Sequence, residues 1–166
     1  MTPDRSPPGL VIEQVDPQGT AALTLLRQAA IEARELYPEL DSPDGAWPAN
    51  PPTPDRGVYL VGFVDGSPIA CGALRPIDDQ AAEVRRMFVL ASSRRHGFAR
   101  AILNTLEEYA STFGFSVLRL ETGNRQLPAI ALYESHGFRR VPPFGAYAND
   151  PTSVCFEKPV GPAPAA

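Results

Sequence analysis

The sequence contains little lysine, cysteine or histidine, and each shortage excludes a class of protein. Lys158 is the only lysine among 15 basic residues. Two cysteines, Cys71 and Cys155, are too few for a disulfide framework, and two scattered histidines do not suggest a metal site. No apolar run reaches membrane-spanning length, and residues 1–9 lack the apolar centre of a signal peptide. We therefore expect a cytoplasmic protein with no bound metal and no membrane association.

Charge is distributed unevenly along the 166 residues. Residues 1–82 carry 12 acidic and 5 basic side chains, whereas residues 83–166 carry 7 acidic and 10 basic ones. The net charge of −4 and the lack of a basic stripe argue against a nucleic-acid partner. The basic second half suits an anionic ligand, because arginine binds phosphate through two parallel hydrogen bonds.

Hydrophobic periodicity and turn residues predict one domain over residues 10–158, with a flexible segment 1–9 before it and a disordered Pro/Ala-rich tail 159–166 after it. Residues 38–56 are rich in proline and have no periodicity, which predicts a long loop. Strands are expected at 10–15, 57–64, 68–74, from 83, and at 115–120, 138–141 and 153–157. Helices are expected at 19–36, from about 97 to 114, and from 128 to 137.

The stretch 83–108 organises the prediction. Its first residues have the composition of a strand, and residues 99–109 place apolar side chains at helical spacing. Between them lie Arg94, Arg95 and Gly97, where a helix must begin. A helix start offers unpaired N–H groups and partial positive charge, and a glycine there lets a ligand approach the backbone. This combination predicts an anion site, most naturally one for phosphate.

Two motifs carry a resemblance to a known family. The spacing Arg94-x-x-Gly97-x-Ala99 resembles the Arg/Gln-x-x-Gly-x-Gly/Ala signature of the GNAT superfamily of N-acetyltransferases. Residues 120–138, which contain Leu-Glu-Thr-Gly, Gln126, Ala-Ile-Ala-Leu-Tyr-Glu and Gly-Phe, are similar to the last motif of these enzymes. Ala99 and Gln126 stand where many members have Gly and Asn. Over about residues 58–158, the resemblance implies an α/β (α+β) fold with a mixed, mostly antiparallel sheet of six to seven strands flanked by helices.

The resemblance also implies an activity. The protein is expected to move the acetyl group of acetyl-coenzyme A, its co-substrate, to a primary amine by direct attack in a ternary complex. The acceptor is a small molecule or a peptide, and a homodimer is left open. The alternative is a non-catalytic acyl-coenzyme A-binding or regulatory module on the same fold. Cys71 has no paired base in the sequence, so we do not expect a covalent acetyl-enzyme.

The cofactor residues follow from the same resemblance. The backbones of Met87 and Val89 would face the acetyl and pantetheine portion, and the basic turn would wrap the pyrophosphate. Gln126 would hydrogen-bond the cofactor, with a helix cap or a solvated amide as the alternative. The full expected set is Met87, Phe88, Val89, Arg94, Arg95, His96, Gly97, Phe98, Ala99, Arg100, Gln126 and Tyr133.

Two residues are expected to move protons. Glu83 lies 11 positions before Arg94, like the glutamate that serves as base in some histone-acetylating relatives; its alternative role is a structural ion pair with an arginine. Tyr133 matches the tyrosine that protonates the departing thiolate, and its alternative role is packing. Strand alternation predicts that odd-numbered residues 83–89 share one face and even-numbered residues 84–90 the other.

The acceptor pocket is expected to include Tyr37, Glu39, Trp47 and Tyr147, which lie on or beside the loops that vary most in the family. Trp47 could instead cover the core. The carboxylates of Glu39, Asp41 and Asp44 lead us to predict a positively charged amine as acceptor. The alternative is that these carboxylates keep a proline-rich loop soluble.

Overall fold

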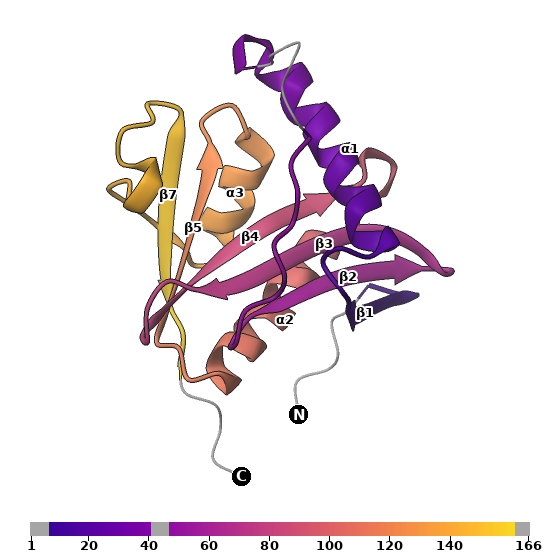
Figure 1. Ribbon diagram of the computed structural model, residues 1–166, viewed down its shortest axis with the longest axis horizontal. Helices are drawn as coiled ribbons and strands as arrows, with labels where there is room; N and C mark the ends of the chain where they lie inside the picture. The colour runs from indigo at the N-terminus through magenta and orange to yellow at the C-terminus, as the bar shows by residue number, and fades with distance from the viewer. Residues whose placement is uncertain (1–6, 41–46, 162–166) are drawn as a thin grey trace.

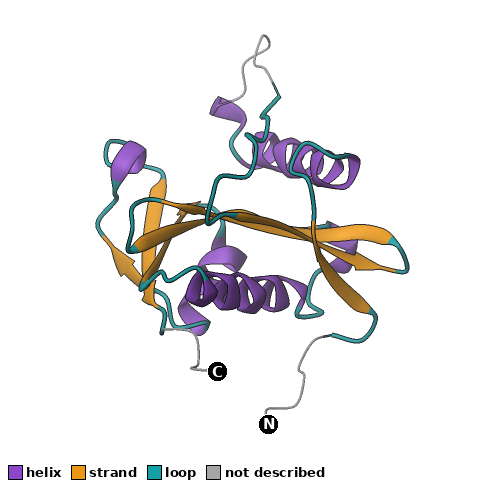
Figure 2. Cartoon of the chain, turned by 60° about the horizontal axis from the view of Figure 1, so that its bottom comes forward, coloured by secondary structure: helices purple, strands orange, loops and turns teal. Residues whose placement is uncertain are grey.

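The computed structural model describes residues 7–40 and 47–161. Seven strands form one sheet in the order β1-β2-β3-β4-β5-β7-β6, with α1 on one face and α2 and α3 on the other (Figures 1 and 2). The strands are β1 (Leu10–Gln14), β2 (Val58–Val64), β3 (Ser67–Pro76), β4 (Ala81–Val89), β5 (Val117–Gly123), β6 (Arg139–Val141) and β7 (Ser153–Pro159). The helices are α1 (Thr20–Leu36), α2 (Phe98–Thr112) and α3 (Leu127–Ser135), with 3-10 turns η1 (Pro38–Leu40), η2 (Ala91–Ser93) and η3 (Gly145–Tyr147). The predicted mixed, mostly antiparallel fold is confirmed.

Each face of the sheet has its own apolar cluster, because each helix buries a stripe of side chains at helical spacing. On one face α1 packs Ala22 and Leu25 against Tyr59, Val61 and Cys71. The larger cluster on the other face is formed by α2, α3 and the sheet, and α2 buries in it Ala101, Ile102, Leu103, Leu106 and Ala110. The two clusters support the central strands from both faces. The sheet can open, by loss of strand pairing, at the ends of β4 and β5.

The observed elements extend past some predicted boundaries. β3 continues to Pro76, and β7 includes Pro159. The Val160 N–H also donates to the carbonyl of Ser116 at 2.9 Å, so sheet contacts extend past the predicted domain end at residue 158. Residues 1–6 and 162–166 of the two predicted flexible ends lie outside the described residues.

β4 and β5 pair only at their first residues. They are the one parallel pair of the described sheet, and their register runs from Ala81 opposite Val117 to Val84 opposite Leu120. β4 then continues to Val89 and β5 to Gly123, and Figure 1 shows the two strands diverging beyond their shared start. The sheet therefore contains a fork in its middle, with one unpaired strand edge on each side.

A bulge in β4 lies at the base of this fork. Cys71 pairs with Phe88 and Ala73 with Arg85, so Gly72 of β3 faces two residues of β4, Arg86 and Met87. Arg86 has a φ of 60°, in the left-handed region. An extra residue in one strand increases its bend and shifts the faces of all residues that follow.

The bulge makes the predicted alternation of β4 wrong beyond Arg85. Val84 packs in the cluster of α2, and so do Met87 and Val89, whereas Phe88 packs in the cluster of α1. Odd-numbered residues before the bulge and even-numbered residues after it therefore share the α1 face. As a consequence Glu83 and Met87 lie on opposite faces.

Gly72 provides a test of this close packing. A Cβ on Gly72 would lie 2.6 Å from Cγ2 of Ile102 and 2.7 Å from Sδ of Met87. We therefore expect Gly72→Ala to lower the free energy of unfolding by about 1–3 kcal/mol, the usual cost of overpacking a core. Urea unfolding followed by circular dichroism measures this loss.

Gly161→Ala is the matched control, because a Cβ there meets no atom within 4 Å, and it should change the stability by less than about 0.5 kcal/mol. Equal stabilities of the two variants would contradict the packing described for Gly72.

Candidate active site

Tyr133, on α3, belongs to the apolar cluster on the α2 side of the sheet. Its ring is 5% exposed and packs against Phe138 and Phe156, with ring centroids 5.8 and 6.1 Å apart. Burial, with the nearby charge of Glu121, raises the pKa of the Tyr133 phenol above its usual value. The hydroxyl makes no hydrogen bond to another described residue. It therefore keeps its proton at neutral pH and has a donor to offer to a ligand in the fork.

Glu83 lies on the other face of β4 and is only 4% exposed. Its Oε1 accepts from Nε of Arg75 at 3.1 Å and lies 3.0 Å from the NH2 nitrogen of the same arginine. Its Oε2 accepts from the hydroxyl of Tyr147 at 2.7 Å. Burial and this bond raise the pKa of Tyr147 to about 12. A buried carboxylate is thus held in place by a cation on β3 and a phenol on η3.

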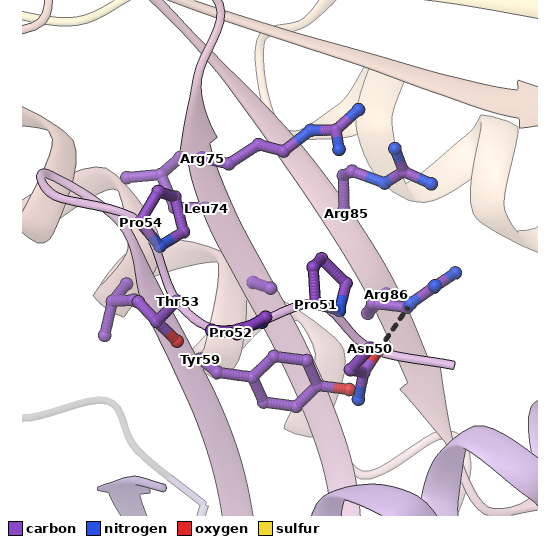
Figure 3. A pocket seen from close by; sticks show the side chains of 12 residues that line it. Asn50, Pro51, Pro52, Thr53, Pro54, Tyr59, Leu74, Arg75, Arg85 and Arg86 are labelled. Carbon is purple, nitrogen blue, oxygen red and sulfur yellow. Dashed lines mark hydrogen bonds between the residues drawn. The ribbon is translucent and has the colours of Figure 1, made fainter. Parts of the chain in front are cut away.

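An open hollow of about 680 Å³ lies in front of Glu83. Its polar side chains come from β3, β4 and η3, and its apolar ones come from the proline-rich segment before β2, from Ile77 and from Phe144. A smaller cavity of about 90 Å³ adjoins it under the same proline-rich segment, and Figure 3 shows this cavity with Arg75 and Arg85 projecting in the same direction. The residues shared by both are Pro51, Pro52, Pro54, Arg75 and Arg85.

Sequence reasoning gave the arginines of the two cavities no role beyond the alternative of an ion pair between Glu83 and an arginine that it did not name. Arg75 and Arg85 are 45% and 31% exposed and approach the same carboxylate oxygen of Glu83, the second at 3.9 Å. Arg86, at the bulge, donates to Oδ1 of Asn50 at 2.9 Å and to the carbonyl of Ala49. Burial and the charges of Arg85 and Arg75 lower the pKa of Arg86. The pairing of β3 with β4 brings these three arginines together. In the sequence, the strand composition of the segments around them was the only indication of this.

The predicted phosphate turn has the expected backbone. Gly97 caps α2 with a φ of 80°, and Arg95 also has a positive φ of 68°. Among the described residues, a Cβ at Gly97 would meet only Pro7, at 3.7 Å. The first N–H groups of α2 have no partner within the helix.

Two of the predicted phosphate ligands have other partners in the structure. Arg94 pairs with Glu32 of α1 at 2.6 Å and donates to the carbonyl of Val89. Arg100 donates to the hydroxyl of Ser135 at 2.8 Å and contacts His136 at the end of α3. Their roles in binding a cofactor remain predictions.

The remaining predicted cofactor residues belong to three parts of the fold. Met87, Phe88 and Val89 are on the part of β4 that has no strand on the β5 side. His96, Phe98 and Ala99 belong to the turn and the first turn of α2, with the rings of His96 and Phe98 5.7 Å apart. Gln126 is at the start of α3, where its side chain makes no capping hydrogen bond.

The predicted acceptor residues are dispersed. Tyr147 lines the hollow. The hydroxyl of Tyr37 accepts from the Arg125 N–H at 2.9 Å, over the end of β5, and Glu39 pairs with the same arginine at 2.6 Å. Trp47 stacks on Arg27 and Arg34 of α1, 4.2 and 3.8 Å from its ring centroid. Asp41 and Asp44 lie outside the described residues.

Two further groups near the fork bear on its chemistry. Glu121 lies on β5 just past the last β4 pair, accepts from Ser153 at 3.2 Å, and has its pKa raised by burial and by the charges of Asp150 and Glu83. Cys71 is buried, and burial raises the pKa of its thiol to about 12. Its Sγ donates to the carbonyl of Arg86 at 3.1 Å, so this thiol is a poor nucleophile.

Two properties of the described residues limit the other kinds of site. No helix in the ranges 7–40 and 47–161 is long and apolar enough to cross a membrane. Within the same ranges, no three His, Cys, Asp or Glu side chains are grouped so that they could hold a metal ion.

Comparison with known proteins identifies the family. Residues 21–138 match the model of the acetyltransferase (GNAT) family. An "IAA acetyltransferase" of Azospirillum brasilense is 41% identical over 104 residues, which cover 61% of this chain and 67% of that protein. An uncharacterised N-acetyltransferase of Bacillus subtilis, YsnE, is 41% identical over 90 residues, 53% of this chain and 60% of the relative. The chain thus aligns with roughly two thirds of the length of each relative.

Solved structures extend the similarity over nearly the whole chain. A Klebsiella pneumoniae protein assigned to the acyl-CoA N-acyltransferases has a TM-score of 0.76 and 28% identity, over 92% of this chain and 98% of that one. A GNAT acetyltransferase of Elizabethkingia anophelis with acetyl-CoA bound has a TM-score of 0.65 and 16% identity, over 92% and 99% of the two chains, and shares the fold. The chain therefore belongs to the acetyltransferase (GNAT) family, whose enzymes transfer an acyl group from acetyl-coenzyme A.

Proposed function

We propose that this protein transfers the acetyl group of acetyl-coenzyme A to a primary amine by direct attack within a ternary complex. The observation that carries the proposal is the fork between β4 and β5, with Tyr133 on one face of the sheet and Glu83 on the other. Two substrates that enter from opposite faces can meet there without an enzyme-bound intermediate. The pKa of Cys71, raised to about 12 by burial, is a further argument against a covalent acetyl-enzyme.

The cofactor would lie along the α2 side of the fork. The N-terminus of α2 and the turn 94–97 present backbone N–H groups and positive charge to its pyrophosphate. The pantetheine arm would extend along the unpaired edge of β4 at residues 87–89, where a carbonyl or amide can hydrogen-bond to the strand as a neighbouring strand would. Backbone N–H groups on this edge would also stabilise the negative charge that develops on the thioester oxygen.

The acceptor amine would approach from the hollow in front of Glu83. Its nitrogen attacks the thioester carbonyl carbon, so that a C–N bond forms and the C–S bond breaks. Each oxygen of Glu83 already accepts from Arg75 or Tyr147, but a carboxylate oxygen has two lone pairs. Glu83 can therefore take the amine proton through one water while its own position is held.

Tyr133 would donate the proton that the departing thiolate needs. Its raised pKa keeps the phenol protonated as the pH rises through neutrality, so the acid form is present wherever the amine is partly deprotonated. The products are an acetamide and coenzyme A with a free thiol. The amine loses one proton to solvent through Glu83, and Tyr133 recovers one proton from solvent, so the protons balance.

Substitutions of Gly97 test whether the turn before α2 binds the pyrophosphate. We expect Gly97→Glu to weaken acetyl-coenzyme A binding at least tenfold more than Gly97→Ala, measured by calorimetric titration. Both variants carry the backbone strain of a side chain at a φ of 80°, but only glutamate adds a negative charge where the pyrophosphate should lie. Each charge-assisted hydrogen bond lost is worth about 1.5–3 kcal/mol. Equal affinities of the two folded variants would place the pyrophosphate elsewhere.

A substitution of Tyr133 tests its proposed role as the general acid. Tyr133→Phe should lower kcat by about 10²-fold or more, the usual effect of losing a general acid, while the affinity for acetyl-coenzyme A changes by no more than a few-fold. Release of coenzyme A thiol with an amine panel measures turnover. The control is Tyr109→Phe, since Tyr109 packs on Phe113 of α2, with ring centroids 5.7 Å apart.

An unchanged kcat in Tyr133→Phe would leave the tyrosine with a packing role alone. Cofactor binding without turnover of any amine by the wild type would instead favour the non-catalytic module.

A further inference from the structure

The hollow in front of Glu83 contains more positive charge than its carboxylates balance. Arg75, Arg85 and Arg86 line the two adjoining cavities. Of the described charged side chains that line the larger hollow, two are cationic, Arg75 and Arg85, and one is a carboxylate, Glu83, which is buried among the arginines. Glu121 and Asp150, which interact with each other, line neither cavity. The lining of the hollow therefore has an excess of one positive charge.

Arg85 is the arginine whose positive charge remains available to a ligand. Arg75 gives two of its nitrogens to Glu83, at 3.1 and 3.0 Å, and Arg86 is tied to Asn50 and Ala49. Arg85 comes no closer to Glu83 than 3.9 Å, beyond hydrogen-bond distance, and makes no hydrogen bond to another described residue. Its side chain is 31% exposed and lines the hollow, so its donors face either water or a bound anion.

The rest of the wall is apolar. Pro51, Pro52 and Pro54 form one side, and Ile77 and Phe144 form another. Phe144 is held edge-on against Tyr147, with ring centroids 5.4 Å apart. A ligand that fills the hollow would therefore bury an apolar body against these side chains while it presents an anion to Arg85.

We propose that the acceptor is an amine that also carries a carboxylate and an apolar side chain, the chemistry of an aliphatic or aromatic amino acid. This inference rests on the proposed function, because it names the acceptor class of the same site. A single carboxylate matches both the excess of one charge and the planar fork of a guanidinium. In such a molecule the amine is only a few bonds from the carboxylate. With the carboxylate on Arg85, the amine would therefore lie near Glu83, which takes its proton.

The same charges argue against the positively charged acceptor predicted from the acidic loop. Glu39, one of the three carboxylates behind that prediction, is paired with Arg125 at 2.6 Å and does not line the hollow. A cation without a carboxylate would have to approach Glu83 past Arg75 and Arg85, which like-charge repulsion disfavours.

The test compares acceptors that differ only in the carboxylate. L-phenylalanine and L-leucine are each assayed beside the corresponding amino-acid amide, with acetyl-coenzyme A and release of coenzyme A thiol as readout. The wild type should prefer each acid over its amide in kcat/KM. Arg85→Gln should lower kcat/KM for the acid about 10- to 100-fold more than for the amide, chiefly through KM, as expected for loss of a charge-assisted hydrogen bond. The change in the ratio is decisive, because it cancels the different basicity of the two amines.

Arg140→Gln is the control, since Arg140 is an exposed arginine of β6 outside the hollow and its replacement makes the same change in net charge. Arg85→Lys should restore part of the preference for the acid, because the charge returns without the fork. Thermal unfolding of each variant verifies that it is folded.

A binding measurement separates this proposal from the proposed function. N-acetyl-L-phenylalanine and N-acetyl-L-phenylalaninamide, titrated into the protein in the presence of coenzyme A, require no turnover. The acid should bind more tightly to the wild type, and Arg85→Gln should remove this difference. If that result is found and no amine is turned over, the carboxylate site stands and the catalytic proposal fails. If the acid binds no more tightly than the amide, or if Arg85→Gln leaves the acid-to-amide ratio in kcat/KM unchanged, the carboxylate proposal is overturned.

Discussion

The early end of the pairing between β4 and β5 is the constraint on which the rest of the structure depends. After Val84 and Leu120 the strands share no register, yet both continue for several residues because β3 holds one and β7 the other. An unpaired strand edge inside a sheet would normally be costly, since its N–H and C=O groups need partners. In the proposed complex, the amide groups of the cofactor arm would supply such partners, so the opening of the sheet and the binding of acetyl-coenzyme A would depend on each other.

The bulge at Arg86 determines what each side of the opening contains. Before it, Glu83 and Arg85 face the α1 side; after it, Met87 and Val89 face the α2 side. One extra residue therefore separates the proposed acceptor surface, which is rich in charge, from the proposed cofactor surface, which is largely backbone and apolar side chain. Gly72 permits the arrangement, because any side chain there would meet the displaced Met87.

Local features of the fold could be predicted from the sequence, and features that depend on pairing between distant segments could not. A glycine among arginines before an apolar stripe predicts a helix start near Gly97. In the structure Gly97 caps α2 with a φ of 80°. The bulge has no such signal, since an arginine at positive φ is not what local preference would select. The contact of Arg75 with Glu83 depends on the register of β3 on β4. The contact of Trp47 with two arginines of α1 likewise joins distant segments, and its role in an acceptor pocket remains a prediction.

The position of Glu83 gives a physical reason for the proposed recognition of the acceptor by charge. A carboxylate that is 4% exposed is stable only when donors surround it, and here the donors are Arg75 and the hydroxyl of Tyr147, with Arg85 3.9 Å away. These arginines cannot be neutralised completely by one carboxylate, so stabilising Glu83 leaves residual positive charge in the space where the amine must arrive. An acceptor with its own negative group removes that imbalance, whereas a simple cation increases it. The proposed buried base and the proposed preference for an acceptor with a carboxylate would thus be two consequences of the same cluster.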